Sequence, residues 1–141
     1  MKYLLLYLLS SIILFASDVS QYKVKILETI MQEILVDSEI YVWCDNDVLL
    51  NELKNHHIIH TTQNCQSANL LIIENDNVPE KCMNKYIFVL KYNLLSDIKH
   101  SFGALFWKKG RPNIIILEPR IKAQSIMIKE ELKPYLEEKI W

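Results

Sequence analysis

Apolar residues occur along the chain in short groups whose spacing predicts individual elements. The clearest helix is predicted over residues 21–36, where Tyr22, Ile26 and Ile30 recur at helical spacing and charged residues fill the other face. Such a stripe is typical of a helix packed on a sheet. A helix that binds a partner has the same pattern, so both interpretations stay open.

The first half of the chain then alternates between β-rich groups and helical patterns. Strands are predicted over residues 39–44, 57–62, 69–74 and 86–90, and helices over residues 48–55 and 94–100, the first of them capped by Asp47. The third and fourth strands are almost entirely apolar, as expected for parallel strands that are buried on both faces. Alternating strands and helices predict a mainly parallel sheet with helices on its faces.

The second half of the chain has a different pattern. Residues 104–107 and 113–117 are two β-rich runs around a short segment that contains Gly110, which predicts a β-hairpin. A helical turn is predicted to begin at Glu118, and a last helix over residues 128–141 should be kinked by Pro134. The fold class that we predict is α/β: a single domain with a mainly parallel sheet, flanking helices and a C-terminal β-hairpin.

The N-terminal residues are predicted to be a targeting signal. Lys2 is followed by an apolar run that extends from Tyr3 to Ala16, which is shorter than the roughly 20 residues of a membrane span. We predict a signal peptide at residues 1–16 and a single periplasmic domain at residues 17–141. Retention of the apolar run as an uncleaved anchor is the alternative.

Charge and glycine content exclude several classes of function. The chain has 16 basic and 17 acidic residues, so there is no overall positive field to attract nucleic acid, and no nucleic-acid partner is expected. Its two glycines, Gly103 and Gly110, exclude a dinucleotide-binding fingerprint, a P-loop and a nucleophile elbow. The Ser, His and Asp residues also form no motif that fixes catalytic roles. With no catalytic set identified, we expect a protein that is not an enzyme and that carries no cofactor.

Three cysteines in an exported protein leave at least one thiol unpaired. Cys65 and Cys82 each precede a predicted buried strand, so both would lie at the same end of a parallel sheet, whereas Cys44 ends a strand. A disulfide between Cys65 and Cys82 with a free Cys44 is therefore favoured. A Cys44–Cys65 disulfide and three buried thiols are the alternatives.

Two groups of polar residues are candidates for metal binding. His56, His57 and His60 would place the outer two residues roughly 13 Å apart in a strand, so we favour a solvated or packing role and expect no metal site. Asp45 and Asp47 follow a strand at the edge where α/β sheets bind ligands, and could hold a cation. A turn followed by a helix cap is the favoured interpretation of these two residues.

The densest basic feature is the predicted hairpin tip. Lys108, Lys109 and Arg111 lie there beside Phe106 and Trp107. The tip could contact an acidic partner, a phosphate headgroup or a peptidoglycan carboxylate, and charged tips also keep sheet edges from aggregating.

The order of these features resembles the YfiR-like family of bacterial periplasmic regulators. The resemblance is carried by the stretches KVKILETI (residues 23–30), IYVWCD (40–45), SFGALF (101–106), NIIILE (113–118) and IMIKEEL (126–132). It implies a protein that is not an enzyme and that binds and restrains the periplasmic part of an inner-membrane diguanylate cyclase. The resemblance also implies that a disulfide stabilises the protein and makes the restraint sensitive to envelope redox stress.

The function predicted from the sequence is an exported regulatory protein that binds a membrane sensor. The predicted contact residues are Tyr22, Ile26 and Ile30 on the first helix and Phe106, Trp107, Lys108, Lys109 and Arg111 on the hairpin. A structural subunit of a cell-envelope assembly is the first alternative, and a homo-oligomer is compatible with it. A small-ligand or metal-binding module that uses Asp45, Asp47 and the histidines is the second alternative.

Overall fold

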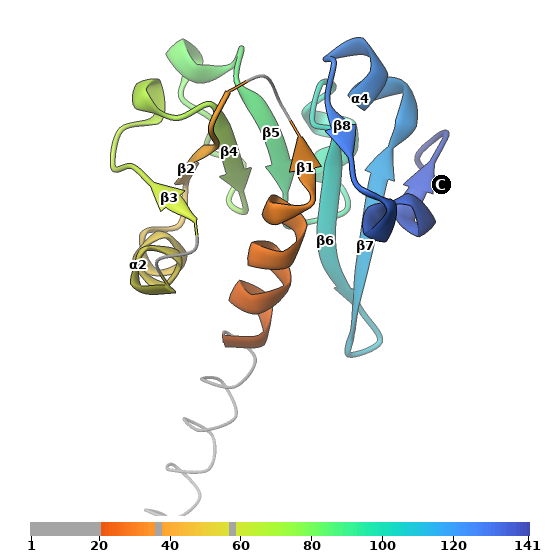
Figure 1. Cartoon of the computed structure of the whole chain (residues 1–141), viewed down its shortest axis with the longest axis horizontal. Coiled ribbons are helices and arrows are strands. Elements are labelled where there is room, and N and C mark those ends of the chain that lie inside the picture. Colours follow the sequence, from red (N-terminus) through yellow and green to blue (C-terminus); the bar gives the residue numbers. More distant parts are fainter. Residues whose placement is uncertain (1–20, 36–37, 57–58) are drawn as a thin grey trace, which may run out of the picture.

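A computed structural model of the chain describes residues 21–35, 38–56 and 59–141 (Figure 1). Its first element is an α-helix whose described residues are 21–32. The elements that follow, with η for 3₁₀ helices, are β1 (Ile34–Leu35), β2 (Tyr41–Cys44), α2 (Asp47–His56), β3 (His60–Thr61), η1 (Cys65–Ser67), β4 (Leu70–Ile73), η2 (Glu80–Cys82), β5 (Tyr86–Val89), α3 (Leu94–Asp97), β6 (Gly103–Lys108), β7 (Arg111–Leu117), α4 (Glu118–Ala123), β8 (Met127–Ile128), η3 (Glu130–Tyr135) and β9 (Leu136–Glu137).

Seven of these strands form one sheet in the order β3-β2-β4-β5-β6-β7-β9 (Figure 1). The strands from β3 to β6 are parallel to one another, and β7 pairs antiparallel with β6. The chain winds in opposite directions on the two sides of the β2–β4 pair, as in a doubly wound sheet. The predicted α/β fold with a mainly parallel sheet, flanking helices and a C-terminal β-hairpin is confirmed.

The two faces of the sheet belong to two separate cores. In β4, Leu70 and Ile72 enter the first core, whereas Leu71 and Ile73 enter the second. The first helix and α2 cover the first core, and η1, η2 and α3 cover the second. Because both faces of β4 are covered, all four of its residues are buried and apolar.

The first helix is shorter than the sequence predicts. Its helical residues end at 32, not 36, and β1 follows and pairs antiparallel with β8. Ile34 also fits the helical pattern, but it lies in β1, where it pairs with Ile128. Its side chain is buried in the first core. The backbone N–H of Lys129 donates to the Glu33 carbonyl at 2.9 Å, so this pairing satisfies groups that the end of the helix leaves free.

The predicted C-terminal helix over residues 128–141 is wrong. This part of the chain instead forms β8, the 3₁₀ helix η3 and the edge strand β9, which pairs parallel with β7. Pro134 lies inside η3 and lacks the N–H group that a longer α-helix would require there. The spacing of Leu132 and Leu136 is therefore compatible with a 3₁₀ helix followed by a strand. In this arrangement both residues still pack in the first core.

The remaining predictions need smaller adjustments. The predicted strand over residues 57–62 contains β3, which is restricted to His60–Thr61, while residues 57 and 58 lie outside the described part. The helix predicted over residues 94–100 ends earlier, because α3 spans only Leu94–Asp97. The predicted signal peptide also lies outside the described residues.

Candidate functional site

The β6–β7 hairpin ends in a tight turn formed by Lys109 and Gly110. Both residues have a positive φ, of 52° and 74°, which is typical of a two-residue turn whose twist matches that of the paired strands. Lys108 lies opposite Arg111 across this turn. The three side chains of Lys108, Lys109 and Arg111, called the basic tip below, are therefore gathered at one end of the hairpin and are exposed.

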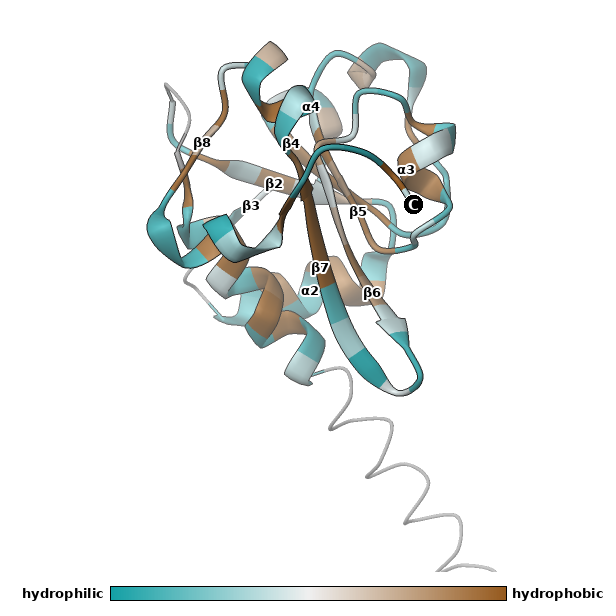
Figure 2. Ribbon diagram, turned by 90° about the vertical axis from the view of Figure 1, so that its right-hand side faces the viewer, coloured by the Kyte–Doolittle hydropathy of each residue, from teal (hydrophilic) through white to brown (hydrophobic). Residues whose placement is uncertain are grey.

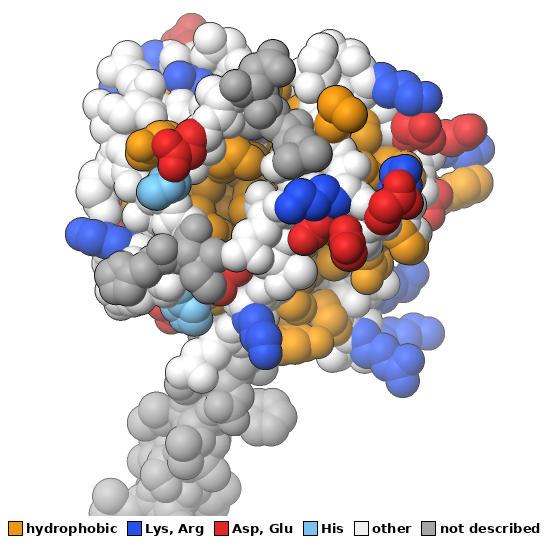
Figure 3. All heavy atoms as spheres, in the orientation of Figure 1, with side chains coloured by type: hydrophobic (Ala, Val, Ile, Leu, Met, Phe, Trp, Pro, Cys, Tyr) orange, Lys and Arg blue, Asp and Glu red, His pale blue; other side chains and the backbone are white. Residues whose placement is uncertain are grey.

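The basic tip carries uncompensated positive charge. Every ion pair found within the described ranges involves other residues, so none of the three cations has a carboxylate partner there. Figure 2 shows β7 changing from apolar to hydrophilic residues toward this tip, and Figure 3 shows basic side chains gathered over it. The tip can attract an anionic surface without first breaking contacts within the domain.

Phe106 and Trp107 lie on opposite faces of the hairpin, because successive residues of a strand point to opposite sides. Trp107 packs against the first core on the side of the first helix. Phe106 packs against the second core, where its ring meets the ring of Tyr92 edge-on with the centroids 5.1 Å apart. These two adjacent aromatic residues therefore pack against different cores.

An open groove lies beside the hairpin. It has a volume of about 600 Å³ and is lined by Tyr92, Phe106, Trp107, Lys108, Asn113, Ile115 and Trp141. We call it the aromatic groove. Apolar rings provide contact area, while Lys108 and Asn113 supply a charge and an amide, the usual combination in a site that binds a ligand by shape and fixes its orientation by a few polar groups.

The last residues of the chain form one wall of the aromatic groove. The Tyr92 hydroxyl donates to the backbone carbonyl of Trp141, and Ile140 packs against the second core. The Lys139 ammonium lies 4.3 Å from the centroid of the Trp141 ring. Sequence patterns did not identify Tyr92, Asn113, Ile115 or Trp141 as site residues, because the fold alone brings this C-terminal segment back to the hairpin.

The predicted contact face of the first helix needs correction. Tyr22 is exposed, at 52% of its surface, but Ile30 is only 1% exposed and belongs to the first core. Ile26 is half-buried and packs against the same core. The apolar stripe of this helix therefore faces the sheet, and a partner could reach Tyr22 and the edge of Ile26 but not Ile30.

The carboxyl edge of the parallel strands, where ligands bind in many doubly wound sheets, is closed by hydrogen bonds. The Asp45 carboxylate accepts the backbone N–H groups of Glu74 and Asn75, both at 2.8 Å, and of Asn77 at 3.1 Å. These bonds occupy both carboxylate oxygens, so Asp45 organises the loop after β4. The structure supports the turn interpretation of this residue.

The helix cap that we assigned to Asp47 belongs to its neighbour. The Asn46 side-chain oxygen accepts the backbone N–H groups of Val48 at 3.1 Å and Leu49 at 3.2 Å, while Asp47 is the first residue of α2 and is exposed. An asparagine side chain caps a helix as well as an aspartate does. Sequence alone could not decide between two adjacent capping residues.

Asn46 also takes part in an ionic network with Glu74. The Asn46 amide donates to one oxygen of Glu74 at 2.7 Å, and Lys23 of the first helix donates to the other at 2.6 Å. Partial burial alone would raise the pKa of Glu74. The hydrogen bonds from Lys23 and Asn46, and the charges of Lys23 and Lys91, outweigh it and lower that pKa below its ordinary value.

Cys44 is buried beside this network and is the free cysteine. Burial raises the pKa of its thiol to about 12, more than the hydrogen bond from the Asn46 backbone lowers it. Because the thiolate is the reactive form, Cys44 is poorly suited to nucleophilic or redox chemistry in the folded protein.

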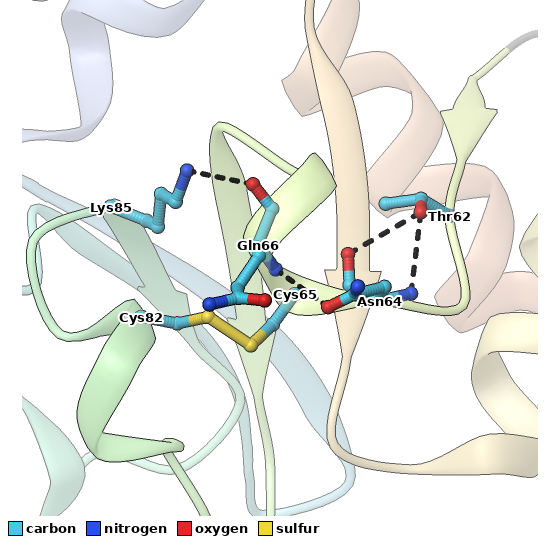
Figure 4. The surroundings of a disulfide bond; sticks show 6 residues. All are labelled: Thr62, Asn64, Cys65, Gln66, Cys82 and Lys85. Carbon is cyan, nitrogen blue, oxygen red and sulfur yellow. Dashed lines mark hydrogen bonds between the residues drawn. A yellow bond between two sulfur atoms is a disulfide. The ribbon is translucent and has the colours of Figure 1, made fainter.

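A disulfide joins Cys65 of η1 to Cys82 of η2, with the Cα atoms 6.1 Å apart (Figure 4). This is the pairing that the sequence favours, and it follows from the parallel β4 and β5, which both begin at the same end of the sheet. Nearby, Asn64 accepts the backbone N–H of Gln66, and Lys85 donates to the Gln66 carbonyl. The bridge lies at the end of the sheet opposite the hairpin turn.

The histidines bind different carboxylates. Nδ1 of His56 lies 2.9 Å from Oε1 of the buried Glu28, and Nε2 of His60 lies 2.5 Å from Oε1 of the exposed Glu39. His57 lies outside the described residues. No three metal-binding side chains converge on one point in the described ranges.

Comparisons with known proteins give no relatives. No family model, curated protein or solved structure matches this chain. Within the described part of the chain, no helix has both the length and the apolar character needed to cross a bilayer. Proposals about function therefore depend on the geometry of the groove, the tip and the disulfide.

Proposed function

We propose that this chain is an exported regulatory protein, not an enzyme, that binds the periplasmic part of a membrane signalling protein of the diguanylate cyclase type and modulates it. The observation that carries this proposal is the aromatic groove, an open site of about 600 Å³ beside the hairpin. We propose that a segment of the partner inserts an apolar side chain there.

The composition of the groove suits a protein partner. Tryptophan and tyrosine are enriched among the residues that dominate protein–protein binding, because they offer a large contact area together with a polar group. Tyr92 and Phe106 are held by their edge-on contact, and Trp141 is 76% exposed, so the site combines a rigid floor with an accessible wall. Lys108 at the rim would select a partner segment that carries a carboxylate.

The closed carboxyl edge of the sheet favours a binding protein over an enzyme for a small substrate. In a doubly wound sheet a substrate would be expected near Asp45 and Glu74, after β2 and β4. In this chain, both oxygens of Asp45 accept backbone N–H groups, and both oxygens of Glu74 accept hydrogen bonds from Lys23 and Asn46. The aromatic groove is a more accessible site than that edge.

Two features support export. The apolar run that ends at Ala16 has the composition of a signal peptide. The Cys65–Cys82 disulfide is of a kind that persists in oxidising compartments and is rare in the cytosol. A periplasmic location would place the groove in the same compartment as the proposed partner.

Site-specific photo-crosslinking in cells tests the proposal. A photoreactive amino acid at Asn113 or Lys108 should give a covalent adduct with one integral membrane protein, because both residues line the groove. The matched control is the same amino acid at Lys122, an exposed position on α4. Adducts at Lys122 alone, or no membrane protein at either groove position, would overturn the proposal.

A second measurement tests modulation. The purified protein is added to membranes that contain the partner identified by crosslinking. This addition should change the rate at which the membranes form cyclic diguanylate. Lys108→Glu should weaken this effect, since it reverses the charge at the groove rim, whereas Lys122→Glu should not. An unchanged rate at saturating protein would show that binding has no regulatory consequence.

A further inference from the structure

We propose that the basic tip binds the surface of a membrane that contains anionic lipids, with lipid phosphate groups as the ligands of Lys108, Lys109 and Arg111. This inference does not depend on the identity of a protein partner. Lys108 belongs to both the tip and the groove rim, whereas Lys109 and Arg111 belong to the tip alone.

The first step is the charge of the tip. Three cations lie on four consecutive residues of a turn that projects beyond the rest of the sheet, and within the described residues none of them forms an ion pair (Figure 1). The positive φ of Lys109 and Gly110 keeps Lys108 and Arg111 side by side. A compact group of cations matches the dense negative charge of lipid headgroups, which attract basic segments.

The second step is the position of the tip relative to the N-terminus of the described chain. The described part of the first helix starts, at residue 21, at the same end of the molecule as the hairpin turn, and both perpendicular views agree on this (Figures 1 and 2). The apolar run ends at residue 16, so five peptide links, or at most roughly 18 Å, separate it from residue 21. While residues 1–16 are held in a membrane, during export or as a retained anchor, this end of the domain lies close to the headgroups.

The third step is the apolar surface between the helix and the tip. Ile26 of the first helix and Trp107 and Ile114 of the hairpin are half-buried and pack against the same core. Figure 3 shows apolar side chains between the start of the helix and the basic side chains of the hairpin. A tryptophan next to cations is typical of surfaces that lie at the level of lipid headgroups, since its ring is partly apolar and its N–H is polar.

The expected strength follows from the number of charges. Each lysine or arginine near an anionic surface contributes about 1 kcal/mol, which is about a fivefold change in affinity, so three contribute on the order of a hundredfold. Such binding is reversible and weakens as salt screens the charges. The tip would therefore orient a domain that is already near the membrane, and the aromatic groove would face the part of a partner closest to the bilayer.

Vesicle co-sedimentation tests the inference. It uses the protein in the form in which it accumulates after export. The probes are vesicles of phosphatidylcholine alone and vesicles that also contain phosphatidylglycerol. The test variant combines Lys108→Gln, Lys109→Asn and Arg111→Gln, in which asparagine keeps the positive φ of the turn. The control variant combines Lys81→Gln, Lys99→Gln and Lys122→Gln, which has the same net charge but changes exposed lysines of η2, the loop before β6 and α4.

We expect wild type and the control variant to bind the phosphatidylglycerol vesicles, and the test variant to bind them on the order of a hundredfold more weakly. Circular dichroism should show that all three proteins are folded. Equal binding by test and control variants, or equal binding to both kinds of vesicle, would overturn the inference. If the test variant binds vesicles like wild type but loses the Asn113 crosslink, the tip contacts the protein partner instead. Wild-type protein that binds the phosphatidylglycerol vesicles but gives no crosslink from Asn113 would refute only the proposed function of the groove.

Discussion

Lys23 of the first helix and Glu74 at the end of β4 form an ion pair, with Nζ and Oε1 2.6 Å apart. The side chains of both residues are about four-fifths buried, so solvent screens this pair less than a surface pair. Because Glu74 also accepts the Asn46 amide, one carboxylate connects the first helix, the loop before α2 and the end of β4.

This network predicts a loss of stability in acid. The pKa of Glu74 is lowered in the folded protein from the ordinary 4.5, so its contribution is present above pH 4.5 and is lost as the pH falls through the lowered value. Glu74→Gln should therefore lower the unfolding free energy by about 1 kcal/mol at pH 7 and have a smaller effect near pH 3. Urea denaturation at the two pH values measures this. An equal loss at both would show that charge is not the cause.

Cys44 should be unreactive in the native protein. Its thiol is buried and its pKa is raised to about 12, so at pH 8 almost no thiolate is present or accessible. A thiol reagent should label none of the cysteines in the native, unreduced protein, one of them in urea, and three in urea with reductant. Rapid labelling of the native protein would contradict the burial of Cys44.

The disulfide should contribute substantially to stability. The loop that it closes separates Cys65 from Cys82 by 17 positions, which in the chain-entropy model corresponds to about 3 kcal/mol. The double variant Cys65→Ala and Cys82→Ala should unfold at correspondingly lower urea concentrations. Reductant should destabilise wild type but leave the double variant unchanged. A peptide that links Cys44 to another cysteine, found by mass spectrometry of the unreduced protein, would refute this pairing.

Gly103 should tolerate no larger residue. A Cβ atom at this position would lie 2.7 Å from the Ile115 carbonyl oxygen and 3.0 Å from side-chain atoms of Ile116 and Phe88. Because a backbone oxygen cannot move without disturbing the β6–β7 pairing, Gly103→Ala should cost about 1 to 3 kcal/mol. Gly110→Asn is the matched control, since that position has open space and a positive φ that asparagine adopts. Thermal denaturation should show a clearly lower midpoint only for Gly103→Ala.

Local sequence patterns predicted the elements whose own residues form an unambiguous pattern. The strands β4 and β5 are apolar at every position because both faces of the sheet are covered there. The hairpin is indicated by its turn. The C-terminal segment was misinterpreted because helical spacing also fits a 3₁₀ helix followed by an edge strand. Only tertiary pairing with β7 distinguishes the two.

The candidate site was predicted in part, for a related reason. The cations of the basic tip lie within four consecutive residues, so a turn was sufficient to group them. The aromatic groove joins Tyr92 to Trp141, 49 positions apart, and no spacing rule connects such residues. Ile30 was assigned to a contact face because an amphipathic stripe does not indicate whether a sheet or a partner covers it.

The backbone of Lys109 has a further consequence. A left-handed conformation costs a residue with a Cβ atom about 1 to 2 kcal/mol, a cost that glycine avoids and asparagine largely avoids. With a φ of 52°, Lys109 sustains that cost at the outermost point of the hairpin. At this position, folding and charge impose opposing demands. A library of variants selected only for thermal stability should lose this lysine early, and one selected for attachment to an anionic surface should keep it.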